Sequence, residues 1–207
     1  MLRSLQMDSW SDLPLLGNEP KGTPLTIDEW EALPEDESGE FVDGELRDEE
    51  VPGLLHELAV TWLIVRFQAW LGTGNGFVFG SELKVILSPR TGRKPDVTVV
   101  LPGRSLRGPR RALREPPDIV IEVVTPTARD ERRDRIEKME DYARFSVPFY
   151  WLLDPALGSL EVFELRDGHY LRALAASQGV IESIPGCTGL TLDLGALWSE
   201  LRRIETD

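Results

Sequence analysis

Glu122 interrupts a run of apolar residues, IVIEVV, within the segment 116–126, which reads PPDIVIEVVTP and carries prolines toward both ends. An apolar run between turn-forming prolines is typical of a buried strand. A lone buried carboxylate is costly even after the protein relaxes, so it must be protonated, paired with a base or bound to a metal ion. The rest of the chain must therefore supply a partner for Glu122.

A second acidic residue, Asp96, follows Pro95 at the start of another apolar run, PDVTVV. If the strands that end at Leu101 and Thr125 lie side by side, Asp96 and Glu122 converge on one hard cation. Taken alone, each acid could instead sit in water at a strand end.

A lysine, Lys138, is the candidate base. At the helical period, Lys138 falls inside the apolar arc of the segment 127–147, between Phe145 and Tyr142. A lysine in this position must either extend past the core or direct its ammonium at an internal acid. Two competing possibilities remain at this point: Asp134 as a surface partner of Lys138, and Lys84 as the lysine of the site.

The elements that must position these residues follow from the hydrophobic periodicity and the turn signals. We expect a helix capped by Thr26 and Glu29, a hairpin turning at Asp43-Gly44, a helix over 54–71 and a charged amphipathic helix over 127–147. Strands are expected over 76–87, 94–102, 118–126, 148–154, 160–168 and 169–175, and a terminal helix after 190. The first three strands would form the sheet centre. This order predicts an α/β fold with a mixed sheet flanked by helices.

The composition limits the class of protein, its location and the kind of metal site that the chain can form. The chain has 207 residues, of which 41% are hydrophobic and 29% charged, as expected for a globular protein with one main core. No segment has the length of a signal peptide core or a membrane span, so we expect a cytoplasmic location without membrane contact. Cys187 is the single cysteine and there are two histidines, so a disulfide within the chain and a typical zinc site are excluded. Oxygen ligands favour Mg²⁺ or Mn²⁺.

The net charge of −13 argues at first against a nucleic-acid partner. However, residues 1–57 hold sixteen acids and three bases, a net of −13, whereas residues 90–135 hold twelve bases and seven acids, a net of +5. The basic stretch brackets Glu122. Its arginine-rich part, 103–117, is either a nucleic-acid contact or a solvated loop.

The order of these motifs resembles the PD-(D/E)XK nucleases, and more closely the Uma-two family of restriction endonucleases within them. The matching segments are DGEL at 43–46, His56, RKPDVTVV at 93–100, PPDIVIEVVTPT at 116–127, the long segment 133–155 and LEVFEL at 160–165. Val124 stands where the simple motif has its lysine, and in the resembled family the lysine is on the following helix. Ser146 and Phe149 depart from the glycine and glutamate usual there.

The resemblance implies a restriction-endonuclease-like fold over residues 24–195, with an N-terminal extension, 1–23, and a C-terminal helical tail, 196–207. It also implies a magnesium- or manganese-dependent endonuclease that hydrolyses DNA. Asp96, Glu122 and the Val123 carbonyl would hold the metal, and Lys138 would orient the attacking water. Further candidates are Glu45 and His56 for the site, and Arg93, Arg104, Arg107, Arg110 and Arg111 for nucleic-acid contact.

Two other functions stay open: a catalytically weak binding module with the nuclease fold, and a structural or small-ligand protein whose polar residues form a buried ion-pair network. Cutting both strands of a duplex favours a homodimer, for which Trp151 and Trp198 are candidate interface residues or simply core residues. Asp118, in a second Pro-Asp dipeptide, is expected to start its strand instead of joining the site.

Overall fold

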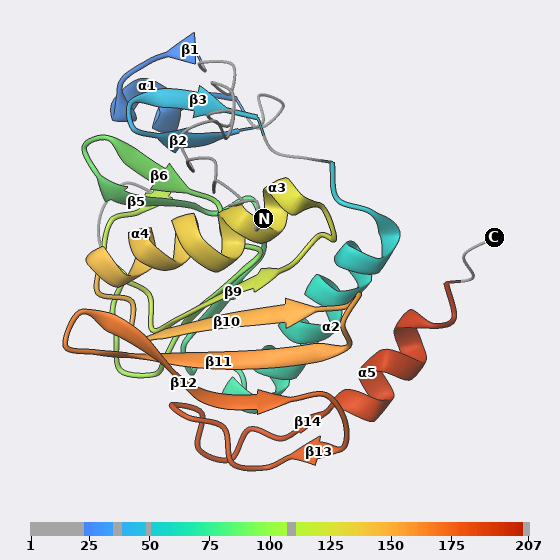
Figure 1. Cartoon of the computed structure of the whole chain (residues 1–207). Helices are drawn as coiled ribbons and strands as arrows, with labels where there is room; N and C mark the ends of the chain where they lie inside the picture. Colours follow the sequence, from blue (N-terminus) through green and yellow to red (C-terminus); the bar gives the residue numbers. More distant parts are fainter. Residues whose placement is uncertain (1–22, 35–38, 49–50, 107–110, 205–207) are drawn as a thin grey trace, which may run out of the picture.

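A computed structural model describes residues 23–34, 39–48, 51–106 and 111–204. Its main sheet has six strands in the order β12-β11-β10-β9-β7-β4 (Figure 1). The strands are β4 (Phe77–Phe79), β7 (Val97–Val100), β9 (Ile119–Val123), β10 (Phe149–Asp154), β11 (Ser159–Arg166) and β12 (His169–Ala176). Only β9 and β10 pair in parallel in this sheet; its other neighbours are antiparallel. The predicted mixed sheet is therefore confirmed.

One face of this sheet packs against two helices. Helix α2 (Leu54–Leu71) lies behind the sheet in Figure 1, and α5 (Leu194–Leu201) packs beside it. Residues of α2 such as Leu63 and Phe67 share one apolar core with β9, β10 and α5. Both helices were expected, and α5 begins at the Asp193 cap, slightly earlier than the predicted tail. Trp151 is fully buried in this core, so of the two predicted alternatives it is a core residue and not an interface residue.

The opposite face of the sheet carries the segment 128–144. Sequence periodicity predicted one regular helix here, but the segment divides into α3 (Ala128–Arg132), a π-helical stretch (Arg133–Lys138) and α4 (Met139–Arg144). The Tyr150 hydroxyl of β10 donates to the Asp134 carbonyl at 2.7 Å, which anchors the π-helical stretch to the sheet. Such stretches are frequently found at functional sites.

The turn after α4 shows why glycine is usual in the resembled family at the position that Ser146 occupies here. Ser146 has a φ of 65°, in the left-handed region that glycine adopts without steric cost. The chain reverses there and enters β10 after Pro148, as the sequence predicted.

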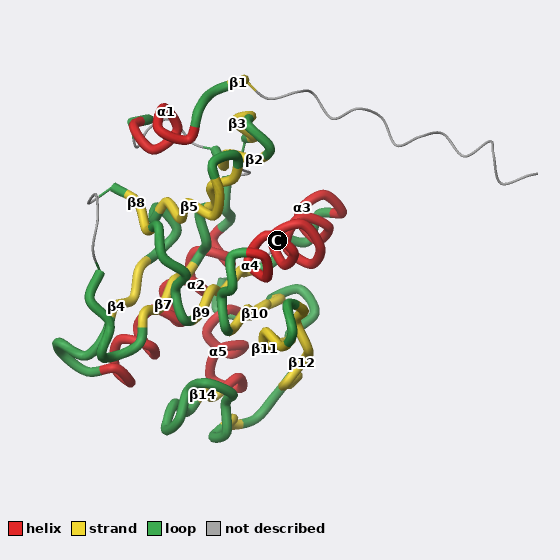
Figure 2. Tube along the Cα trace, turned by 90° about the vertical axis from the view of Figure 1, so that its left-hand side faces the viewer, coloured by secondary structure: helices red, strands yellow, loops and turns green. Residues whose placement is uncertain are grey.

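A second, smaller sheet lies at one end of the molecule, away from β11 and β12 (Figure 2). Its order is β1-β3-β2-β6-β5-β8, with β1 (Thr23–Pro24), β2 (Glu40–Val42), β3 (Glu45–Arg47), β5 (Lys84–Ser88), β6 (Thr91–Arg93) and β8 (Ala112–Leu113). Helix α1 (Ile27–Ala32) has the predicted capping box, and its Trp30 packs over Gly92, where a Cβ atom would collide with the indole. The predicted hairpin at Asp43-Gly44 joins β2 to β3.

One predicted strand is divided between the sheets. The segment 76–87 gives β4 in the main sheet and β5 in the small sheet, separated by a turn at Gly80–Leu83. The first of the three predicted central strands is therefore at the edge, and the centre is β9 with β7 and β10. A short pair, β13 (Val180–Ile181) and β14 (Leu192–Asp193), leads into α5. Within the described ranges, no helix has the length and apolar character that a bilayer span requires.

Candidate active site

A small cavity of about 100 Å³ opens where the main sheet, the π-helical stretch and the start of α2 meet. Its lining includes the three residues that the sequence singled out, Asp96, Glu122 and Lys138, together with Val123. They come from three separate places: the β6–β7 connection, the end of β9, and the last residue of the π-helical stretch. His56, from the first turn of α2, lines the same cavity.

Glu122 finds the partner that its sequence context required. Lys138 Nζ donates to Glu122 Oε2 at 2.8 Å, and the Tyr142 hydroxyl donates to Oε1 at 3.0 Å. Because side chains alternate along a strand, Glu122 faces the helical segment while Ile121 and Val123 face α2. Burial shifts the pKa of Glu122 well above its usual range; Lys138 counteracts this, but neighbouring carboxylates such as Asp96 add to it.

Asp96 holds the end of β9 from the other side. Its Oδ2 accepts the Val123 N–H at 2.7 Å and lies 3.1 Å from His56 Nε2. Burial disfavours protonated His56, but Asp96 outweighs it and raises the pKa of the imidazole. The Val124 N–H donates to Leu153 of β10, so the peptide groups of Val123 point to the opposite edge, toward Asp96.

Lys138 is surrounded by acids. Besides Glu122, its ammonium lies 3.4 Å from Asp134 Oδ1 and 3.6 Å from Glu40 Oε1. Burial opposes the charge, but these carboxylates outweigh it and raise the pKa of Lys138, so the side chain is held as an ammonium. It is 6% exposed, which confirms that it points inward from the helical segment.

The family model of Uma2, described as "Putative restriction endonuclease", matches residues 26–195. The chain belongs to the Uma2 family. Its fold is similar to the crystal structure of "a putative nuclease belonging to DUF820" from Anabaena variabilis ATCC 29413, with a TM-score of 0.69 at 18% sequence identity, over 86% of this chain and 99% of that one. A search of curated proteins gave no significant match. The predicted nuclease family is thereby confirmed.

The oxygen atoms in the cavity fit a hard divalent cation. Within the described ranges, no three His, Cys, Asp or Glu side chains are placed to hold an ion by themselves. The predicted set instead uses two carboxylates, Asp96 and Glu122, and the Val123 carbonyl, which face the same cavity edge and are ligands that Mg²⁺ and Mn²⁺ prefer. Asp134 Oδ1 is also buried in this cavity; it lies 3.4 Å from the Lys138 ammonium and accepts no hydrogen bond from the residues that the structure describes. Its carboxylate is therefore a further oxygen donor beside the predicted set.

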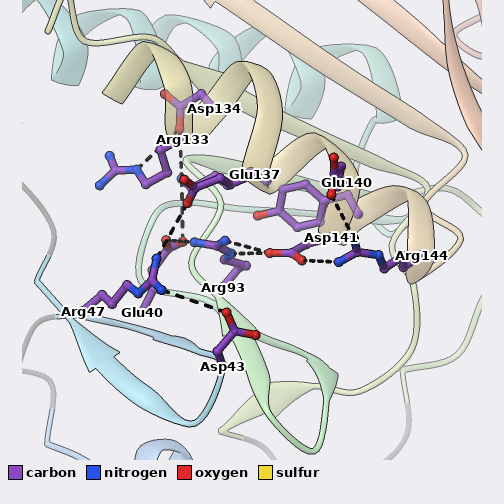
Figure 3. Close-up of polar contacts among 12 residues, drawn as sticks. Glu40, Asp43, Arg47, Arg93, Arg133, Asp134, Glu137, Glu140, Asp141 and Arg144 are labelled. Atoms are coloured by element: carbon purple, nitrogen blue, oxygen red, sulfur yellow. Dashed lines mark hydrogen bonds and ion pairs between the residues drawn. The ribbon is translucent and has the colours of Figure 1, made fainter. Parts of the chain in front are cut away.

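A network from the small sheet supports this Uma2 site (Figure 3). Glu40 of β2 is buried; its Oε2 accepts from Arg93 Nη1 at 2.7 Å, and its Oε1 accepts the Lys94 N–H at 3.1 Å. Arg93 in turn donates through Nε and Nη2 to Asp141 of α4, at 3.0 and 2.7 Å. Burial opposes the charge on Glu40, but Lys138 and Arg93 outweigh it and lower its pKa to about 2. Glu40 thus connects the β6–β7 connection, which carries Asp96, to the π-helical stretch that carries Lys138.

Several predicted residues lie elsewhere. Glu45 is on β3, paired with β1 and β2, and does not line the cavity. Lys84 donates to the carbonyls of Trp30, Glu31 and Leu33 at the end of α1, so it is not the lysine of the site. Asp118 accepts the Leu101 N–H at 2.8 Å and precedes β9, consistent with its predicted structural place.

The arginines proposed for nucleic-acid contact have different surroundings. Arg93 is only 2% exposed and bound by two carboxylates, so its assignment to a nucleic-acid surface is wrong. Arg104 contacts the Pro116 carbonyl and Asp118, while Arg111 is exposed. Arg107 and Arg110 lie outside the described residues.

Sequence reasoning missed other polar residues at the site: Glu40, Ser81, Glu82, Lys94, Arg133 and Tyr142, with Asp134 considered only as a surface partner. Lys94 could have been identified from the sequence, because it directly precedes Pro95-Asp96. The same holds for Glu40, because it precedes the apolar pair Phe41 and Val42 in a strand that is buried throughout. No sequence feature could have identified Arg133, because its approach to the cavity depends on the π-helical geometry.

Proposed function

We propose that this protein is a divalent-metal-dependent endonuclease that hydrolyses phosphodiester bonds in DNA. The observation that carries the proposal is the convergence of Asp96, Glu122 and Lys138, from three separate elements, on one small cavity. Family membership supports the nuclease class. The choice of Mg²⁺ or Mn²⁺ rests on the oxygen donors of the cavity, and the choice of DNA rests on the family description as a restriction endonuclease.

Each residue has a role that follows from its position. Asp96, Glu122 and the Val123 carbonyl would hold a divalent cation, which would supply Lewis-acid activation of water and stabilisation of negative charge. Lys138 is held as an ammonium beside Glu122, where it orients the attacking water and adds positive charge. His56 fixes Asp96 through the 3.1 Å contact, and Glu40 supports Lys138 from the small sheet.

The two Pro-Asp dipeptides provide a matched test. Supercoiled plasmid is incubated with wild-type protein in Mg²⁺, in Mn²⁺ and in EDTA, and nicked and linear products are measured. Asp96→Asn should reduce cleavage by about 100-fold or more because a metal ligand is lost. Asp118→Asn, the same change outside the cavity, should retain cleavage in proportion to folded protein. Equal cleavage by wild type and Asp96→Asn would contradict the proposal.

One observation favours a second function. Three buried carboxylates already neutralise Lys138, as expected for a nuclease fold that keeps an ion-pair network and binds a partner without catalysis. The absence of metal-dependent cleavage, together with unchanged thermal stability in Mn²⁺, would support this alternative.

A further inference from the structure

Two lysines reach the cavity, and their surroundings differ. Lys138 lies at the back, against Glu122, Asp134 and Glu40, whose side chains are each at most 4% exposed. Lys94 comes from the β6–β7 connection, and its Nζ lies 2.9 Å from Oε2 of Glu82, whose side chain is 71% exposed. This partner of Lys94 is therefore on the solvent side of the cavity.

The position of Lys94 is built into the fold. Its N–H is held by Glu40 Oε1 at 3.1 Å, and it is followed by Pro95 and then Asp96, so its backbone is fixed next to a proposed metal ligand. Its side chain is only 6% exposed. A buried ammonium requires a polar or anionic partner, and in this structure the Glu82 carboxylate supplies one.

We infer that Lys94 binds a phosphate group of the nucleic-acid substrate at the cavity mouth, and that the Glu82 carboxylate occupies Lys94 until the substrate replaces it. This inference rests on the proposed function. A phosphodiester, like a carboxylate, presents anionic oxygens to the point charge of an ammonium. No covalent bond changes: one charge-assisted contact of Nζ is exchanged for another.

The exchange is favourable because releasing Glu82 from Lys94 costs little free energy. An ion pair with an exposed carboxylate is weak, since water solvates the released Glu82 side chain well. Glu82 lies in the turn between β4 and β5, where its side chain can move into solvent without disturbing either strand. Lys138 cannot make the same exchange, because its partners are buried and would be left unpaired.

The test measures binding of a fluorescently labelled DNA duplex by anisotropy in EDTA, so that no strand is cut. Lys94→Gln should bind about fivefold more weakly and lower the salt slope by about one. Glu82→Gln should bind about threefold more tightly, and this gain should vanish in the Lys94→Gln background because Glu82 acts through Lys94. Glu82 is exposed, so its variant tests the inference even if Lys94→Gln folds poorly.

The ion pair of Glu200 and Arg203 on and after α5 provides a control with the same charge changes away from the cavity. Glu200→Gln and Arg203→Gln should change affinity much less than the corresponding cavity variants. Equal effects at both places, or a Glu82→Gln gain that persists without Lys94, would overturn the inference. If wild type binds and cuts DNA but Lys94→Gln binds equally well, the inference alone fails. A wild-type protein that neither binds nor cuts the duplex overturns the proposed function as well.

Discussion

The two faces of strand β9 differ in the kind of side chain that each can bury. Ile119, Ile121 and Val123 point into the apolar core shared with α2 and α5. Val120 and Val124 point to the other face, beside the tyrosines of α4 and β10, with Glu122 between them. A carboxylate is stable on the second face because Lys138 and Tyr142 meet it there, and a shift by one residue would place it among hydrocarbon side chains. The partners on each face, and not the strand itself, therefore decide where a charge can be buried.

The largest effect should come from moving the acid to the apolar face. Ile121→Asp should lower the free energy of unfolding by more than about 4 kcal/mol, because its carboxylate would be buried without a partner. Urea unfolding followed by circular dichroism measures this loss. Ile121→Val, the control, should cost only about 1 kcal/mol. An Ile121→Asp protein of near-normal stability would show that the apolar face accepts charge.

On the polar face, removing the base should be nearly as harmful. Lys138→Met leaves Glu122 and Asp134 without their ammonium, and the expected loss of unfolding free energy is about 3–5 kcal/mol. The double variant Lys138→Met/Glu122→Leu should recover part of this loss, since the buried carboxylate is removed as well. Strictly additive losses in the same urea experiment would mean that the two residues are not coupled.

Lys84 gives a smaller and different effect. Lys84→Met removes three bonds to carbonyls at the end of α1, with an expected cost of about 1–2 kcal/mol, and should leave plasmid cleavage per folded molecule unchanged. Lys138→Ala should reduce single-turnover cleavage by about 100-fold. A cleavage defect in Lys84→Met as large as that of Lys138→Ala would return Lys84 to the list of site residues.

The sequence was informative where local pattern and tertiary environment agree. Glu122 within an apolar strand, and Lys138 within an apolar arc, each signalled a buried charge that needs a partner, and the structure joins them. The same reasoning failed for Arg93, because an arginine in a basic stretch is expected at the surface. Its burial depends on ion pairs with Glu40 and Asp141, which are distant in the sequence.

Two further differences depend on long-range geometry. The division of 76–87 between two sheets is set by the partners β7, β6 and β8, which periodicity within the segment cannot identify. The π-helical stretch depends on packing against β10, including the Tyr150 bond to the Asp134 carbonyl. The boundaries 1–23, 24–195 and 196–207, and the homodimer, stay predictions.

The central claim, that the polar face of β9 forms a divalent-cation site, is tested most directly by thermal unfolding in Mn²⁺ and in EDTA. A ligand at about 100 times its dissociation constant stabilises a folded protein by about 2.7 kcal/mol, so Mn²⁺ should raise the Tm of the wild type by several degrees. Asp118→Asn should show the same rise, and Asp96→Asn should show none. A wild-type Tm that does not change with Mn²⁺, or an equal rise in Asp96→Asn, would contradict the account.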